Sequence, residues 1–190
     1  MSDPVGALQP GTHAGFAEIQ VLPPQGMIAL RGDLSDAGFK AAVTAAVPLD
    51  VPGPNAASFD GTRGIFWMSP DELLLLCPYA EVAGHVDSIG AALAGTHHLV
   101  ADISDARAVF AVDGVDAREV LGKLTPADLA PSVFGPGSFR RTRLAQVAAA
   151  VLCETDNRFV LVCFRSVAGY VHELLKTAAI PGSEVGYWRD

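Results

Sequence analysis

The stretch Phe159-Val160-Leu161-Val162-Cys163-Phe164 is an apolar run typical of a buried strand, and the segment Ser166–Ala179 that follows it has the period of a helix. In this second segment, a mostly apolar stripe recurs every three or four residues. Its members are Val167, Tyr170, Val171, Leu174, Leu175 and Ala178. A stripe of this kind lets one side of a helix pack on a sheet. The stretch therefore predicts a strand followed by an amphipathic helix.

The same unit occurs earlier in the chain. The block Val167-Ala168-Gly169-Tyr170-Val171 resembles Val82-Ala83-Gly84-His85-Val86, which lies 85 residues before it. Each block follows an apolar run that ends in a cysteine, at Cys77 and at Cys163. Corresponding segments at a nearly constant offset indicate an internal repeat.

Hydrophobic periodicity predicts the order strand, strand, helix, strand, strand, helix in each half. In the first half these segments are 16–22, 27–30, 35–47, 62–68, 72–77 and 79–94. In the second half they are 98–104, 108–112, 116–124, 143–153, 159–164 and 166–179. The third of these helices opens with Asp116 and has Glu119 three residues later, the spacing of a capping box.

The pattern predicts an α+β protein whose two β-β-α-β-β-α halves are pseudo-symmetric. Hairpins with intervening helices favour mixed or antiparallel sheets over a doubly wound parallel sheet. The linker at 95–98 is too short to separate independent domains. We therefore expect one pseudo-symmetric unit over residues 1–190, with halves at about 12–95 and 97–180 and a C-terminal tail at 181–190.

Composition indicates a globular protein with a large core and few charges. The 190 residues are 50% hydrophobic and 18% charged, and the formal net charge is −8. An acidic chain lacks the basic face that nucleic acid requires, so no nucleic-acid partner is expected. No apolar stretch is long enough for a membrane span, and the N-terminus lacks the features of a secretory signal. These observations predict a cytoplasmic protein without a membrane partner.

The three cysteines, Cys77, Cys153 and Cys163, lie in apolar runs and form no C-x-x-C pair. We interpret them as buried thiols in a reducing compartment. So few charges on so apolar a chain leave little polar material to cover a monomer. Because contiguous apolar patches on proteins usually mark interfaces, we expect a permanent partner.

One segment of the chain is locally basic. Arg140, Arg141 and Arg143 lie close together, with Arg141 and Arg143 on one side of the predicted strand and Arg140 on the other, and Arg165 begins the final helix. Arginines placed in this way can bind a carboxylate, a phosphate or an acidic partner. Solvated strand ends would have the same pattern. We therefore treat Arg140, Arg141, Arg143 and Arg165 as a candidate partner interface, with simple solvation as the alternative.

No motif of an active site accompanies this segment. The glycine-rich run 135–140 lacks the third glycine and the strand-to-helix context of a dinucleotide site. A G-x-S-x-G elbow and an H-E-x-x-H pair are both missing, and the five histidines are not at metal-ligand spacing. The sequence therefore predicts no catalytic, cofactor-binding or metal-binding residue in this chain.

Five stretches together resemble a known family, the gamma subunit of heterotetrameric sarcosine oxidase. They are Met27-Ile28-Ala29-Leu30-Arg31-Gly32-Asp33-Leu34, Gly64-Ile65-Phe66-Trp67-Met68-Ser69-Pro70-Asp71-Glu72-Leu73-Leu74-Leu75-Leu76, Ser104-Asp105-Ala106-Arg107-Ala108-Val109-Phe110, Arg140-Arg141-Thr142-Arg143-Leu144-Ala145-Gln146-Val147-Ala148-Ala149 and Cys163-Phe164-Arg165-Ser166-Val167-Ala168-Gly169-Tyr170. They occur in the family's order and extend over most of the chain. None of them is a catalytic signature.

The resemblance implies a subunit of an alpha-beta-gamma-delta assembly that oxidatively demethylates sarcosine to glycine. That reaction consumes oxygen, releases hydrogen peroxide and passes a one-carbon unit to tetrahydrofolate. The resemblance further implies FAD in the beta subunit, FMN between alpha and beta, NAD and a folate-binding region in alpha, and zinc in delta. The gamma subunit of that family is similar in fold to the folate-binding domain of aminomethyltransferases.

Three functions therefore remain open at the level of the sequence, and the least favoured of them is a generic regulatory binding module. The first is a non-catalytic structural subunit of the sarcosine oxidase complex, with alpha, beta and delta as its partners. The second is a stand-alone tetrahydrofolate-binding protein or one-carbon transferase of the same fold. No acidic residue that could hold a pterin is identifiable in the sequence, which favours the structural subunit.

Overall fold

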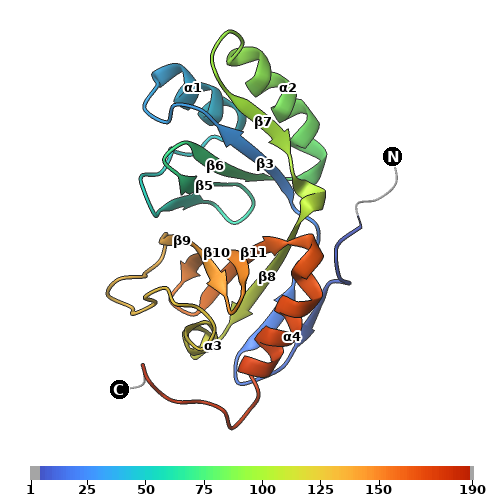
Figure 1. The fold of residues 1–190 in the computed structure, drawn as a ribbon, viewed down its shortest axis with the longest axis vertical. Helices are drawn as coiled ribbons and strands as arrows, with labels where there is room; N and C mark the ends of the chain where they lie inside the picture. Colours follow the sequence, from blue (N-terminus) through green and yellow to red (C-terminus); the bar gives the residue numbers. More distant parts are fainter. Residues whose placement is uncertain (1–4, 189–190) are drawn as a thin grey trace. The chain divides into compact units, whose positions relative to one another are not determined.

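A computed structural model describes residues 5–188 of the chain (Figure 1). The chain divides into two compact units. One comprises the residues up to Pro24 together with those from Asp105 onward, and the other comprises Gln25–Ser104. Each unit contains one sheet and two α-helices, and every strand pair in both sheets is antiparallel. The α+β class with antiparallel sheets is thus confirmed.

The first unit is built on a six-stranded sheet in the order β1-β2-β8-β11-β10-β9. Its strands are β1 (Gly11–His13), β2 (Glu18–Val21), β8 (Arg107–Asp113), β9 (Phe139–Leu144), β10 (Val147–Thr155) and β11 (Arg158–Phe164). Two helices, α3 (Ala117–Gly122) and α4 (Ala168–Ala178), pack against this sheet. Apolar residues of the sheet and both helices, including Phe110, Phe159 and Val171, form one buried cluster.

The second unit is built on a five-stranded sheet in the order β4-β5-β6-β3-β7. Its strands are β3 (Gly26–Arg31), β4 (Ala57–Phe59), β5 (Gly64–Ser69), β6 (Glu72–Cys77) and β7 (Leu99–Asp102). The helices α1 (Ala37–Ala46) and α2 (Val82–Ala92) bury Phe39, Val43 and Ile89 in the core of this unit. Three short 3₁₀ helices, η1 (Tyr79–Glu81), η2 (Ser104–Ala106) and η3 (Arg165–Val167), complete the two units.

Each sheet combines strands from both halves of the sequence. β2 comes early in the chain but pairs with β8, so that Ile19 lies opposite Val112. β7 begins the second half but pairs with β3, so that Val100 lies opposite Leu30. Because of this exchange, the compact units do not have the same membership as the sequence segments 12–95 and 97–180.

Local sequence accounts for where the helices begin. The side chain of Asp36 accepts a hydrogen bond of 2.7 Å from the Phe39 backbone N–H and so caps α1. The positions of α1, α2 and α4 agree with the predicted helices to within a few residues at each end. The predicted capping box of α3 is wrong, since Asp116 makes no side-chain cap to this helix. The Glu119 carboxylate instead accepts hydrogen bonds from the backbone N–H groups of Val185 and Gly186.

The predicted strand 143–153 is also wrong as a single element. The structure divides it between β9 and β10, which pair through the turn at Ala145 and Gln146. Ala145 has a φ of 48°, a conformation that helps to reverse the chain and that residues other than glycine seldom adopt. No glycine or asparagine marks this turn, and the mostly apolar run that follows it favours the prediction of one continuous strand.

The positive φ of Ala145 predicts that Ala145→Gly will stabilise the fold. Glycine removes the steric cost of this conformation but loses more chain entropy on folding than alanine does. The steric effect is the larger of the two, so the free energy of unfolding should rise by about 0.5–1 kcal/mol. The same substitution at the exposed strand residue Ala148 should lower it by a similar amount. Chemical denaturation of the three proteins measures both changes, and equal effects at the two positions would contradict the explanation.

Candidate functional site

The four candidate arginines do not lie on one surface. Arg141 and Arg143 are exposed on β9, which is an edge strand of the six-stranded sheet. Arg140 directly precedes Arg141 and lies on the opposite side of the strand, where its Nη1 donates to the Phe139 carbonyl at 2.9 Å. Its guanidinium carbon is 5.5 Å from the centroid of the Phe134 ring. The structure therefore keeps Arg141 and Arg143 together and separates Arg140 from them.

Arg165 holds the N-terminal segment of its own chain. Its Nη1 donates to the Val5 carbonyl at 2.7 Å, and its Nη2 donates to the Gly6 carbonyl at 3.2 Å. A guanidinium fits two neighbouring acceptors well because its donors form a rigid fork. The structure thus gives Arg165 a defined role within the chain.

A row of residues crosses the six-stranded sheet at Arg143. Register places Arg143 opposite Ala148, and Phe164 opposite Arg107. The β10–β11 register continues the row from Ala148 to Phe164, since Ala149 pairs with Cys163. Directly opposed residues on antiparallel strands point to the same side of a sheet. Arg143, Ala148, Phe164 and Arg107 therefore share one side of the sheet.

Two members of this row form a stacked pair. The Arg107 guanidinium carbon is 4.0 Å from the centroid of the Phe164 ring, and Phe164 is 48% exposed. Stacking of this kind is favourable and orders both side chains. Arg143 is exposed and makes no hydrogen bond or ion pair with the part of the chain that the structure describes. The sequence did not reveal the row because its residues come from four strands.

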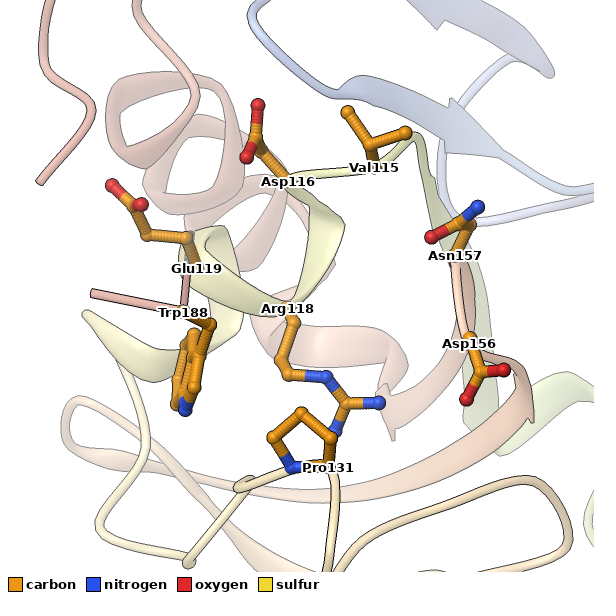
Figure 2. A pocket seen from close by; sticks show the side chains of 8 residues that line it. All are labelled: Val115, Asp116, Arg118, Glu119, Pro131, Asp156, Asn157 and Trp188. Carbon is orange, nitrogen blue, oxygen red and sulfur yellow. The ribbon is translucent and has the colours of Figure 1, made fainter. Parts of the chain in front are cut away.

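A cavity of about 660 Å³ lies at the other end of the first unit, beside α3 (Figure 2). Its lining residues come from the loop after β8, from α3, from the β10–β11 turn, from the loop before β9 and from the C-terminal segment. They are Val115, Asp116, Arg118, Glu119, Pro131, Asp156, Asn157 and Trp188. Gly114 has a φ of 131°, and its N–H donates to the Asn157 carbonyl at 2.9 Å. This hydrogen bond connects the loop after β8 to the β10–β11 turn, which form two walls of the cavity.

Arg118 is the buried cation of this cavity and is only 6% exposed. Its Nη1 donates to the carbonyl of Leu129 at 2.5 Å and to that of Phe134 at 2.8 Å. Its guanidinium carbon lies 4.9 Å from the centroid of the Phe159 ring. Because a buried charge requires partners, these contacts both satisfy Arg118 and fix the loop that carries Leu129 and Phe134.

The C-terminal segment is held on α3 by two charged side chains. The buried carboxylate of Glu119 accepts from the N–H of Val185 and, at 2.8 Å, from that of Gly186. Lys123 donates to the Ser183 carbonyl at 2.7 Å and to the Ala178 carbonyl at 3.0 Å. These hydrogen bonds fix the segment just before Trp188, and the Trp188 side chain forms a wall of the cavity.

Trp188 packs directly over Gly122. A Cβ added at Gly122 would lie 2.6 Å from the edge of the indole ring, closer than such atoms approach. The glycine therefore leaves the space that the indole occupies. Neither this packing nor the role of Glu119 was predicted, because residues 181–190 carry no recognisable element in the sequence.

The three cysteines are free and buried, which confirms the interpretation of their sequence context. Burial raises the pKa of the Cys77 thiol to about 11 and that of the Cys163 thiol to about 11. Burial also raises the pKa of Cys153, against the opposing effect of the nearby Arg118. A thiol with a raised pKa stays protonated and is a poor nucleophile near neutral pH.

These pKa values predict that the folded chain will react slowly with a thiol reagent such as Ellman's reagent at about pH 8. Cys77 and Cys163 should remain protonated and shielded, whereas all three cysteines should react once the chain is unfolded in denaturant. Absorbance of the released thionitrobenzoate measures both states. Rapid reaction of the folded chain with two or more equivalents would contradict the burial of these thiols.

The described residues contain neither a metal-binding cluster nor a membrane-spanning helix. Among residues 5–188, no three His, Cys, Asp or Glu side chains are grouped so that they could hold a metal ion. In the same part of the chain, none of the helices has the length and apolar character needed to span a bilayer.

The fold itself defines a class of protein. Glycine cleavage system aminomethyltransferase T from Bartonella henselae has the same fold, with a TM-score of 0.56 and 15% identity over 80% of this chain and 43% of that chain. A chain of heterotetrameric sarcosine oxidase from Corynebacterium sp. U-96, in a complex with pyrrole 2-carboxylate, is similar with a TM-score of 0.78. The two chains are 26% identical over 88% of this chain and 87% of that one. The chain is thus an α+β protein with the aminomethyltransferase fold.

Sequence comparison gives the family. Residues 31–181 match the sarcosine oxidase, gamma subunit family. The sarcosine oxidase subunit gamma of an Arthrobacter species is 35% identical over 144 residues, which are 74% of this chain and 69% of the relative. The corresponding subunit of Corynebacterium sp. strain P-1 is 34% identical over 145 residues and the same shares of the two chains. The chain belongs to the sarcosine oxidase gamma subunit family, and the resemblance seen in its sequence is confirmed.

Proposed function

We propose that this chain is the gamma subunit of a heterotetrameric sarcosine oxidase in the cytoplasm. Its partners would be the alpha, beta and delta subunits, and the complex would oxidise sarcosine to glycine with release of peroxide and one-carbon transfer to tetrahydrofolate. The observation that carries this proposal is the agreement of sequence and structure, with family membership over residues 31–181 and a TM-score of 0.78 to a chain of such a complex.

Within the complex, we infer that this chain is a structural subunit without a catalytic residue. The charged side chains near its cavity support this inference, because they bind the chain's own backbone. Arg118 donates to two carbonyls, Glu119 accepts from two N–H groups and Lys123 donates to two further carbonyls. FAD, FMN, NAD, zinc and tetrahydrofolate would then be held by the other subunits.

We also propose that the two sequence halves are a pseudo-symmetric repeat and act as a single unit. Strand order supports this proposal. The five-stranded sheet runs β4-β5-β6-β3-β7, and the first five strands of the other sheet, read from β9, run β9-β10-β11-β8-β2. Equivalent strands of the predicted repeat therefore occupy equivalent places, and each sheet ends in a strand from the opposite half.

For the interface, we propose that the surface around Arg141 and Arg143 docks on an acidic region of a partner subunit. Both side chains are exposed on an edge strand, and Phe164 adds an exposed aromatic ring in the row that includes Arg143. Arginine and aromatic residues are enriched among the residues that dominate binding at protein interfaces. Arg140 and Arg165 would support this surface only indirectly, through their contacts within the chain.

The proposed function predicts the outcome of co-purification from the native host. A tagged form of this chain should bring down a yellow complex that produces peroxide when sarcosine is added. Absorbance in the visible range and a peroxidase-coupled assay measure the two properties. A colourless chain that binds tetrahydrofolate tightly and has no partners would contradict the proposal and would favour the stand-alone folate protein.

Charge reversal tests the proposed interface. Arg141→Glu together with Arg143→Glu should weaken assembly at least about tenfold, since like charges at a complementary interface are unfavourable, while the circular dichroism of the chain stays unchanged. Size-exclusion chromatography of the co-expressed subunits measures assembly.

The matched control is Lys40→Glu, which reverses an exposed charge on α1. This variant should assemble like the unmodified chain. Normal assembly of the arginine double variant would show that these side chains are solvated charges and not part of the interface.

A further inference from the structure

Part of the Arg118 guanidinium has no oxygen partner within the fold. Its Nη1 donates to the carbonyls of Leu129 and Phe134, and the thiol of Cys153 is a further polar neighbour. The structure gives Nε and Nη2 no acceptor oxygen among residues 5–188. Arg118 lines the cavity, and Figure 2 shows its guanidinium extending between Pro131 and Asp156.

A carboxylate lies across the cavity from this guanidinium. Asp156 is in the turn between β10 and β11 and is exposed, and it makes no hydrogen bond or ion pair with the described residues. Glu119 is different, because its carboxylate already accepts from the N–H groups of Val185 and Gly186 and is 3.7 Å from the Lys123 ammonium. The cavity thus presents a cationic group at Arg118 and an open anionic group at Asp156.

The remaining walls of the cavity are largely apolar. Trp188, Pro131 and Val115 line it, and the indole of Trp188 is held in place by its packing over Gly122. Ligand sites typically combine apolar walls with a few fixed polar groups that orient the ligand. The volume of about 660 Å³ falls within the range of such sites.

The charged residues of the cavity limit which ligands it can bind. A simple anion at Arg118 would lie near the carboxylate of Asp156, and a simple cation at Asp156 would lie near the Arg118 guanidinium. Either arrangement brings like charges together in a partly desolvated site. A ligand with both charges avoids this cost, because each of its ends meets a group of opposite sign.

We propose that the cavity binds a free amino acid with an apolar side chain. The α-carboxylate accepts hydrogen bonds from the Arg118 guanidinium, and the α-ammonium pairs with Asp156. The side chain packs against Trp188, Pro131 and Val115. This binding site is independent of the proposed function, since sarcosine and glycine lack a side chain that could fill the apolar part of the cavity.

Tryptophan fluorescence tests the proposal on the full chain. The chain has two tryptophans, so Trp67→Phe leaves Trp188 as the sole reporter within the cavity. L-leucine should produce a saturable change in this fluorescence, and calorimetry on the unmodified chain should give the same dissociation constant. No saturable change with leucine in the millimolar range would overturn the proposal.

Three related compounds test each part of the site. Leucinamide lacks the carboxylate, 4-methylpentanoate lacks the ammonium group and glycine lacks the apolar side chain. Each should bind at least about tenfold more weakly than leucine, because each leaves one group of the cavity without its partner. Binding of any of the three with the affinity of leucine would overturn the assigned pose.

A substitution provides the independent check. Asp156→Asn should weaken the binding of leucine and of leucinamide about tenfold, because the ammonium group of each loses its partner, whereas 4-methylpentanoate should bind at least as well as before. The matched control is Asp87→Asn at an exposed position of α2 in the other unit, which should bind leucine normally. Unchanged leucine binding in the Asp156 variant would overturn the site, whereas failure to co-purify with other subunits would bear only on the proposed function.

Discussion

The exchange of one strand between the two halves is the constraint on which the rest of the structure depends. β2 supplies Ile19 and Val21 to the core of the six-stranded sheet, and β7 brings Val100 against the core of the five-stranded sheet. Without these strands, β8 and β3 would become edge strands with unpaired backbone groups and incompletely covered apolar side chains. Neither core is therefore complete until segments from both halves of the chain have paired.

A second principle concerns the use of charge. In the first unit, buried or partly buried charged groups bind backbone atoms of irregular segments: Arg118 fixes the loop before β9, Glu119 fixes the C-terminal segment and Arg165 fixes the N-terminal segment. Such bonds satisfy backbone groups that lie outside the sheets. The exposed Arg141 and Arg143 of β9 and the side of Arg118 that faces the cavity are the charged groups through which we propose that the chain binds other molecules.

Much of the fold could be predicted from local patterns, and the exceptions have physical causes. The apolar stripe at Val167–Ala178 predicted α4, because a helix that is buried on one side has apolar residues at a regular spacing. Short apolar runs predicted β6 and β11 in the same way. The turn at Ala145 was missed because it uses an alanine at positive φ. Glu119 was misassigned because its partners, Val185 and Gly186, are more than sixty residues away in the sequence. Of the candidate interface, the sequence placed Arg141 and Arg143 correctly on one side of a strand. It had no means of showing that Arg165 binds Val5, or that Phe164 and Arg107 extend the row.

The sequence by itself determined the α+β class, the buried thiols, the order of most elements and the family, since these follow from composition, short-range period and motifs read along the chain. Tertiary structure alone decided which strands pair, which arginines stay exposed and where a cavity forms. Strand pairing and cavity walls join residues that are distant in sequence, and their geometry depends on register and packing rather than on local preference. The cavity beside α3 shows this most clearly: its eight lining residues come from five separate segments, and only the folded chain brings Arg118, Asp156 and Trp188 together.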